Sequence, residues 1–146
     1  MRELIDKAEV LIEALPYIQG FRGKVVVVKY GGSTMEAGDP DSILRDIVFM
    51  ECVGMRPIVV HGGGSAISKR LQERGIAPRF VAGLRVTDAD AIRIVEEVIE
   101  EVNRGIVARL EEMGARARGV TGKDRAIHAR KRVVEVERDG GRETVV

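Results

Sequence analysis

The sequence feature that most constrains the fold is a run of four valines, Val25–Val28, followed by Lys29 and by Gly31 and Gly32. A β-branched run without polar alternation indicates a strand buried on both faces, as in a parallel sheet. Ligands of such sheets bind beyond the carboxyl ends of the strands. Adjacent glycines there let backbone N–H groups lie against a phosphate, because no Cβ intervenes. The stretch predicts an anion site with Lys29 as its cation; the alternative is that Lys29 marks the strand's exit from the core and the glycines only turn the chain.

A second short apolar stretch, residues 57–60, leads into His61, three glycines at 62–64 and Ser65. Glycines at a helix start form an anion site from backbone N–H groups and the helix dipole. Three successive glycines cost backbone entropy, which favours close approach to a ligand over a simple flexible turn. Strand, glycine loop and helix thus occur twice, and such crossovers make the strands parallel. We expect both loops at one edge of the sheet, where they can face one ligand.

Neither loop is a common nucleotide-binding fingerprint. The third glycine of G-x-G-x-x-G is missing after residues 62–64, where Ser65, Ala66 and Ile67 follow. The stretch 119–124 has the wrong spacing for a Walker A loop and carries Asp124 where Ser or Thr is required. The sequence therefore predicts anion sites outside these two classes.

Residues 2–18 have the apolar periodicity of an amphipathic helix, which Pro16 should kink or end. Such a helix either packs on the domain's own sheet or forms an arm that packs on another subunit. Further helices are expected from Pro40 to about Gly54, from a Ser65 N-cap through Arg74 to Gly75, and from Asp88 with a Thr87 cap to about Met113 before Gly114.

The remaining segments predict short strands. Residues 80–87 form one extended piece. Strands are expected at 116–120, 126–130 and 133–137, the last in a C-terminal hairpin with 142–146, because Asp139-Gly140-Gly141 is a turn signal.

Length and composition limit the class of protein. The 146 residues suffice for one domain, and 45% hydrophobic with 32% charged residues is typical of a globular chain. A formal net charge of +1 gives no indication of a nucleic acid or an anionic membrane as the main partner. Cys52 is the only cysteine, and with His61 and His128 it cannot make a convincing zinc site. Neither a membrane span nor a signal peptide is visible, so we expect a cytoplasmic protein.

Four single residues carry chemistry that the sequence alone leaves open. Arg85 lies in an apolar extended piece and either forks onto a carboxylate or is a surface arginine. For His61 a structural role is favoured over a catalytic one. Asn103 either bonds a ligand or caps a neighbouring loop. Asp124 either caps a turn or acts electrostatically on Lys29.

Four motifs together resemble the acetylglutamate kinases of the amino acid kinase family. They are Lys-Tyr-Gly-Gly-Ser-Thr-Met at 29–35, Val-His-Gly-Gly-Gly at 60–64, Gly-Leu-Arg-Val-Thr-Asp at 83–88 and Gly-Lys-Asp at 122–124. Their order and spacing match over essentially the whole chain. The resemblance implies an α/β fold, an open three-layer αβα sandwich with a mainly parallel sheet. It also implies phosphoryl transfer from ATP, used with Mg²⁺, to the side-chain carboxylate of N-acetyl-L-glutamate in arginine biosynthesis.

The resemblance assigns roles residue by residue. Lys29 matches the catalytic lysine that stabilises charge on the transferring phosphoryl group. Gly31 and Gly32 match the glycines that lie along the phosphates of the nucleotide. No residue is implied as a direct metal ligand.

The substrate side is assigned in the same way. Gly63 and Gly64 match the backbone that holds the acetylglutamate, and Arg85 matches the arginine on its α-carboxylate. This favours the carboxylate role for Arg85 over that of a surface arginine.

The resemblance also implies a division of the chain. Residues 1–20 resemble the kinked N-terminal helix that interlaces dimers into hexamers in arginine-inhibited members, so a homo-oligomer and arginine as feedback inhibitor are expected. Residues 21–146 resemble the acetylglutamate-binding lobe. Family members continue into a second half that holds most of the nucleotide site. We therefore expect this chain alone not to turn over.

Two local departures accompany the resemblance, and two other functions stay open. Ser65 stands where family members commonly have proline, and the run before Asn103 lacks the usual glycine and is one residue short. The alternatives are a related aminoadipate-type carboxylate kinase and a non-catalytic module for substrate binding or oligomerisation.

Overall fold

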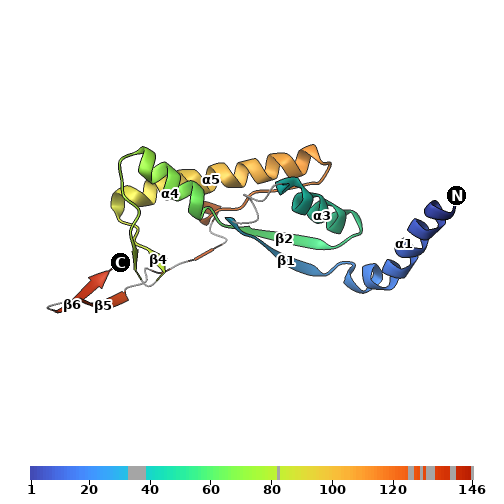
Figure 1. The fold of residues 1–146 in the computed structure, drawn as a ribbon, viewed down its shortest axis with the longest axis horizontal. Coiled ribbons are helices and arrows are strands. Elements are labelled where there is room, and N and C mark those ends of the chain that lie inside the picture. Colours follow the sequence, from blue (N-terminus) through green and yellow to red (C-terminus); the bar gives the residue numbers. More distant parts are fainter. Residues whose placement is uncertain are drawn as a thin grey trace. The chain divides into compact units, whose positions relative to one another are not determined.

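The computed structural model divides the chain into two units. One comprises Met1–Val60 and Arg109–Arg116, and the other His61–Ala108 and Ala117–Val146. The structure describes residues 1–32, 39–81, 83–124, 127–128, 130, 134–138 and 141–145, with the side chains of 40, 134–138 and 141–145 left out. Figure 1 shows the elements along the chain.

The first unit is built on two parallel strands, β1 (Val25–Tyr30) and β2 (Arg56–His61). The amide of Arg56 donates to the carbonyl of Lys24 at 2.9 Å, which joins the starting ends of both strands. Helix α3 (Pro40–Cys52) connects them and lies on one side of the pair (Figure 1). The mixed α/β class with parallel strands is confirmed.

Burial alternates along both strands, and the prediction of burial on both faces is wrong for β1. Val25 and Val27 remain 59% and 65% exposed, and Ile58 and Val60 of β2 are each 51% exposed. The opposite face of the strands faces the core of the unit. The buried side chains of this core are Tyr30 of β1, Leu44 and Ile47 of α3, and Leu110. A sheet covered by helices on one face leaves its other apolar face in water.

Helix α3 begins where the sequence predicts. The Asp39 carboxylate accepts from the amides of Asp41 at 3.1 Å and Ser42 at 3.2 Å, and Pro40 occupies the first turn. These bonds satisfy amides that have no partner inside the helix. Gly54, at φ +88°, ends the helix in the left-handed conformation that glycine adopts without strain.

Helix α1 (Arg2–Phe21) is amphipathic as predicted, and it continues through Pro16. None of its side chains is buried. Packing of this helix on the chain's own sheet is therefore not observed in the described structure. Six of its apolar side chains are at least 48% exposed: Leu4, Ile5, Val10, Leu11, Ile12 and Leu15.

The second unit is held together by α4 (Gly64–Glu73) and α5 (Ala89–Glu112), whose last turn belongs to the first unit. Their apolar faces form one cluster of buried residues. It consists of Ile67, Leu71, Ala91, Ile94 and Val98, with Ile76, Val95, Ile99 and Val102 partly buried against it.

Two predicted helix caps are displaced by one or two residues. Asp88, not Thr87, caps α5, because its carboxylate accepts from the amide of Ala91 at 2.8 Å. Gly63, not Ser65, is the N-cap of α4, so Ser65 lies inside the first turn. Side chains of Asp and Thr are both good caps, and only the local backbone decides between neighbours.

Two short strands within residues 80–87 form a hairpin instead of one extended piece. Strand β3 (Phe80–Val81) pairs antiparallel with β4 (Leu84–Arg85), with Phe80 opposite Arg85. Gly83 has φ +75°, a value that favours glycine. The register places Arg85 and Phe80 side by side across the strands.

The C-terminal segments fit the prediction in part. Strand β5 (Val134–Arg138) pairs antiparallel with β6 (Gly141–Val145), and the turn residues 139–140 lie outside the described residues. Residues 116–120 have no regular structure, since a strand needs a ladder partner, and Ile127, His128 and Arg130 are likewise irregular. Among the described helices, none combines the length and the apolar character that crossing a membrane requires.

Candidate functional site

Lys29 and the glycines after it lie at the carboxyl end of β1. Lys29 is exposed, Tyr30 beside it is 3% exposed, and Gly31 and Gly32 are half-buried. A Cβ built on Gly31 would meet no heavy atom of the described residues within 4 Å. The end of the strand thus presents a cation next to open backbone, an arrangement that suits a phosphate.

Tyr30 anchors this end of the strand. Burial raises the pKa of its hydroxyl above the ordinary value of 10.0, the Arg109 guanidinium opposes the rise, and the Asp41 carboxylate adds to it. The Arg109 side chain forms an ion pair with Asp41, and this bond raises the pKa of Arg109. The phenol therefore stays neutral at physiological pH and fixes the strand next to Lys29.

The second glycine loop leads directly into α4. No side chain of the described residues caps this helix, so the amides of its first turn have no side-chain partner there. Such amides, with the helix dipole, attract an anion. The loop fits the anion site that the sequence predicts.

The two glycines assigned to the substrate differ in surroundings. Gly63 is buried, and a Cβ on it would lie 2.9 Å from Cδ1 of Ile99 and 3.7 Å from Cδ1 of Ile67. Gly64 is exposed, and its Cβ would meet no described atom within 4 Å. Gly63 thus allows the loop to pack against the helices, whereas Gly64 leaves backbone accessible.

Arg85 is held against the start of α4. Its Nη2 donates to the carbonyl of Gly64 at 3.1 Å and to Oγ of Ser68 at 2.7 Å. The guanidinium carbon lies 4.7 Å from the centroid of the Phe80 ring, within cation–π range. Its Nη1 is buried and has no hydrogen-bond partner among the described residues. A buried donor without a partner is costly, so Nη1 keeps an unused capacity to donate a hydrogen bond.

The structure brings Gly63, Gly64 and Arg85 together in one unit, and Lys29, Gly31 and Gly32 lie together in the other. Sequence reasoning missed Ser68 and Phe80. Ser68 lies one helical turn after Gly64, and Phe80 faces Arg85 across the hairpin. Recognition of a hairpin turn at Gly83 would have predicted that Phe80 lies opposite Arg85, because such a turn fixes the register of the two strands.

His61 and Asn103 meet in the second unit. The amide nitrogen Nδ2 of Asn103 lies 3.1 Å from Nε2 of His61, and Nδ1 of the ring lies 3.0 Å from the carbonyl oxygen of Gly62. The structure supports the structural role predicted for His61. Asn103 contacts the side chain of His61, the last residue of β2.

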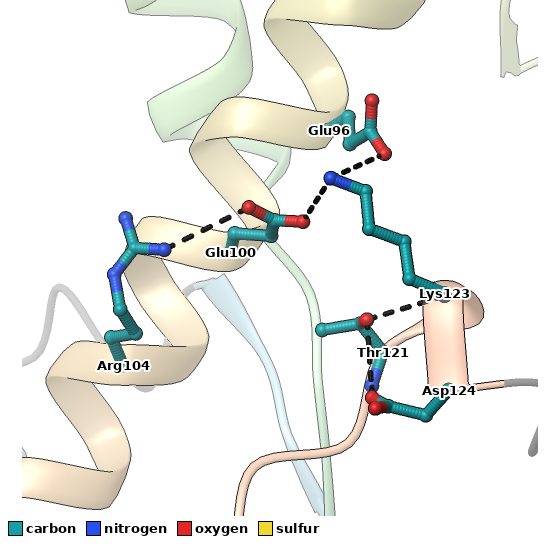
Figure 2. A network of polar contacts seen from close by, with 6 residues as sticks. All are labelled: Glu96, Glu100, Arg104, Thr121, Lys123 and Asp124. Carbon is teal, nitrogen blue, oxygen red and sulfur yellow. Dashed lines mark hydrogen bonds and ion pairs between the residues drawn. The ribbon is translucent and has the colours of Figure 1, made fainter.

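The Gly-Lys-Asp motif forms a short 3₁₀ turn, Gly122–Asp124, attached to α5. Nζ of Lys123 lies 2.7 Å from Glu100 and 3.0 Å from Glu96 (Figure 2), and these bonds raise the pKa of Lys123. Asp124 accepts from the amide of Thr121 at 2.7 Å. The turn role predicted for Asp124 is confirmed.

The described residues offer no group of three or more His, Cys, Asp or Glu side chains that would hold a metal ion.

The sequence profile of the amino acid kinase family matches residues 24–145. Acetylglutamate kinases from Synechococcus sp. and Thermoanaerobacter pseudethanolicus are 52% and 53% identical over 82% of this chain. The acetylglutamate kinase of Methanocaldococcus jannaschii is 44% identical over 100% of it. These alignments cover 40%, 41% and 50% of the relatives, so the chain spans about half the length of the curated relatives it matches.

Solved structures of N-acetylglutamate synthase from Neisseria gonorrhoeae are similar in fold. One, complexed with coenzyme A and N-acetyl-glutamate, has a TM-score of 0.61 and 27% identity over 71% of this chain and 24% of that chain. Another, complexed with coenzyme A and L-arginine, has a TM-score of 0.55 and 27% identity over 74% of this chain and 26% of that chain.

The Asp124 turn makes a prediction about pH. The backbone bond from Thr121 is the main cause that holds the pKa of Asp124 below its ordinary value of 3.8, with the Thr121 hydroxyl and Arg118 acting in the same direction. Because the folded-state pKa is depressed, the carboxylate stabilises the turn at neutral pH, and this contribution is lost as the pH falls through that pKa. We expect an NMR titration of the Asp124 carboxyl carbon to give a midpoint below 3.8.

Thr121→Val should raise this midpoint only in part, since the backbone amide remains. Thr87→Val, on a different segment, is the control and should leave it unchanged. A midpoint at or above 3.8 in the unmodified chain would contradict the assignment.

Proposed function

The chain belongs to the amino acid kinase family, and on that premise we propose that it is the N-acetyl-L-glutamate-binding lobe of an acetylglutamate kinase. The observation that carries the proposal is Arg85. It is fixed by Gly64, Ser68 and Phe80, and its buried Nη1 has no partner among the described residues. A carboxylate is the ligand that a guanidinium fork binds best.

In this proposal the α-carboxylate of N-acetyl-L-glutamate accepts from Arg85, and the backbone at Gly63 and Gly64 holds the rest of the substrate. The uncapped first turn of α4 adds amides that favour an anion or a carbonyl oxygen. The names of the curated relatives and the N-acetyl-glutamate complex of the structural neighbour support this choice of substrate.

The reaction proposed is transfer of a phosphoryl group to the side-chain carboxylate of the substrate. ATP, bound with Mg²⁺, would supply that group. Lys29 would neutralise charge on it, and the backbone of Gly31 and Gly32 would lie along the phosphates. The exposed Lys29 and the open backbone at Gly31 fit this role. Phosphoryl transfer requires positioning and charge neutralisation and no covalent nucleophile.

We propose a second role, in assembly, for α1 and its exposed apolar side chains. An amphipathic helix with no buried residue gains free energy by covering its apolar stripe, and a second copy of the chain offers a matching surface. The arginine complex of the structural neighbour supports arginine as a regulatory ligand. A cytoplasmic location, inferred from the single exposed Cys52, completes the proposal.

Arg85 provides the direct test of the substrate. We expect calorimetric titration with N-acetyl-L-glutamate to show binding that Arg85→Ala weakens by about tenfold to 100-fold, since a hydrogen bond to a charged group contributes roughly 1.5–3 kcal/mol. Arg85→Lys should recover little of this loss, because an ammonium cannot form the fork.

Arg79→Ala is the matched control, since Arg79 is an exposed arginine beside the same hairpin. It should leave the affinity unchanged. Equal binding by the chain and by Arg85→Ala would contradict the proposal. Titration with 2-aminoadipate derivatives distinguishes the aminoadipate-type alternative.

The chain alone should not turn over, because it spans about half the length of its kinase relatives. We expect no ATP-dependent acyl phosphate when the chain is incubated with N-acetyl-L-glutamate and trapped with hydroxylamine. Product above the level of a Lys29→Ala control would show that the chain is catalytically complete.

Removal of α1 tests the assembly role. Sedimentation velocity should give a larger mass for the whole chain than for a chain without residues 1–20, because the exposed apolar stripe drives association. Leu11→Ser combined with Ile12→Ser should reproduce the loss, and Glu9→Gln, a change elsewhere on the helix, should not. The same mass for all four chains would refute the role of α1.

A further inference from the structure

We propose that Asn103 is a positioning residue for the Gly62–Gly64 loop and that it acts through His61. The two side chains lie 42 positions apart and meet through Nδ2 of Asn103 and Nε2 of His61, at 3.1 Å. Neither residue is assigned a role in the function proposed above. The ligand part of the inference rests on that proposed function, whereas the loop geometry does not.

The partners of His61 determine its tautomer. A backbone carbonyl only accepts hydrogen bonds, so Nδ1, which lies 3.0 Å from the oxygen of Gly62, carries the hydrogen. In a neutral imidazole Nε2 is then the acceptor, and the Asn103 amide nitrogen facing it can only donate. The pair is consistent in one arrangement, the Nδ1–H tautomer bonded to Asn103.

Gly119 fixes Asn103 from the other side. A Cβ on Gly119 would lie 2.0 Å from Oδ1 of Asn103 and 3.2 Å from its Cγ. Only glycine leaves room for the amide at this distance, because carbon and oxygen cannot approach so closely. The segment after α5 therefore presses against the oxygen end of Asn103, and the nitrogen end points at the imidazole.

Helix α5 thus supports two successive parts of the loop. Asn103 holds His61 and, through it, the carbonyl of Gly62. Ile99, one helical turn earlier, packs against Gly63, with its Cδ1 2.9 Å from where a Cβ of Gly63 would be. The next residue, Gly64, accepts from Arg85. A change at Asn103 therefore reaches the ligand-binding backbone without any contact of its own with the ligand.

The tautomer can be measured directly in the whole chain. We expect a long-range ¹H–¹⁵N NMR spectrum, recorded at a pH where histidine is neutral, to show Nδ1 of His61 protonated and Nε2 unprotonated; His128→Gln identifies the second histidine. A protonated Nε2 in the unmodified chain would overturn the proposal.

Asn103→Asp replaces the donor by an acceptor, so Nε2 should become protonated, and the carbonyl ¹³C signal of Gly62 should shift as its bond from the ring changes. Affinity for N-acetyl-L-glutamate should fall by about tenfold. Gly119→Ala should lower the affinity in the same way and shift the His61 Nε2 signal, because it displaces Asn103 from Nε2. Arg104→Gln, beside Asn103 on α5, is the control and should cause none of them.

The outcomes separate the two proposals. A chain that fails to bind N-acetyl-L-glutamate, yet shows the tautomer and the Gly62 shift, refutes the proposed substrate and supports the positioning role. A chain that binds as proposed, with an unchanged His61 spectrum and affinity in folded Asn103→Asp, refutes the positioning role. If Asn103→Asp does not fold, Gly119→Ala and the spectrum of the unmodified chain decide.

Discussion

Apolar packing between α4 and α5 is the interaction on which the candidate substrate site depends. Ile67 and Leu71 of α4 are buried against Ala91, Ile94 and Val98 of α5. Each large apolar side chain removed from water contributes about 1.5–3 kcal/mol, more than any exposed polar contact in this unit. This packing fixes the start of α4, where the glycine loop, Ser68 and Arg85 meet. The loop has its geometry because the helices behind it are packed.

Charged contacts have a different part in the second unit. Lys123 bridges Glu96 and Glu100, and Arg70 bonds Glu101 at 2.9 Å, but most of these side chains are well exposed. Exposed ion pairs contribute little free energy, since water and salt screen them. These ion pairs select one arrangement of the surface segments among those that the apolar core permits. The bridge from Lys123 keeps the 3₁₀ turn against α5 in this way.

Sequence reasoning succeeded where structure is set by residues close together in the chain. The helix start at Asp39–Pro40 and the helix ends at Gly54, Gly75 and Gly114 follow from capping chemistry, and all three glycines have positive φ. It failed by one residue at Thr87, where the adjacent Asp88 is also a good cap, and by two residues at Ser65, because the backbone path starts α4 at Gly63.

The predicted strand at 116–120 failed for a different reason. An apolar alternation marks a segment that can be extended, but a strand also requires a neighbour with free ladder groups. Whether such a neighbouring strand is present depends on the tertiary fold. The same holds for the valine run, whose composition suits two covered faces while the described chain covers one.

The sequence by itself determined the parallel strand–glycine–helix units and the residue types that carry charge, because turn chemistry and apolar periodicity are local. The resemblance of its four motifs indicated the family. Only the tertiary structure decided which of these residues meet. It placed Ser68 and Phe80 on Arg85, left Nη1 of Arg85 without a partner among the described residues, and joined His61 to Asn103. Contacts between residues far apart in the chain follow from how helices and strands pack, and no local pattern records that packing.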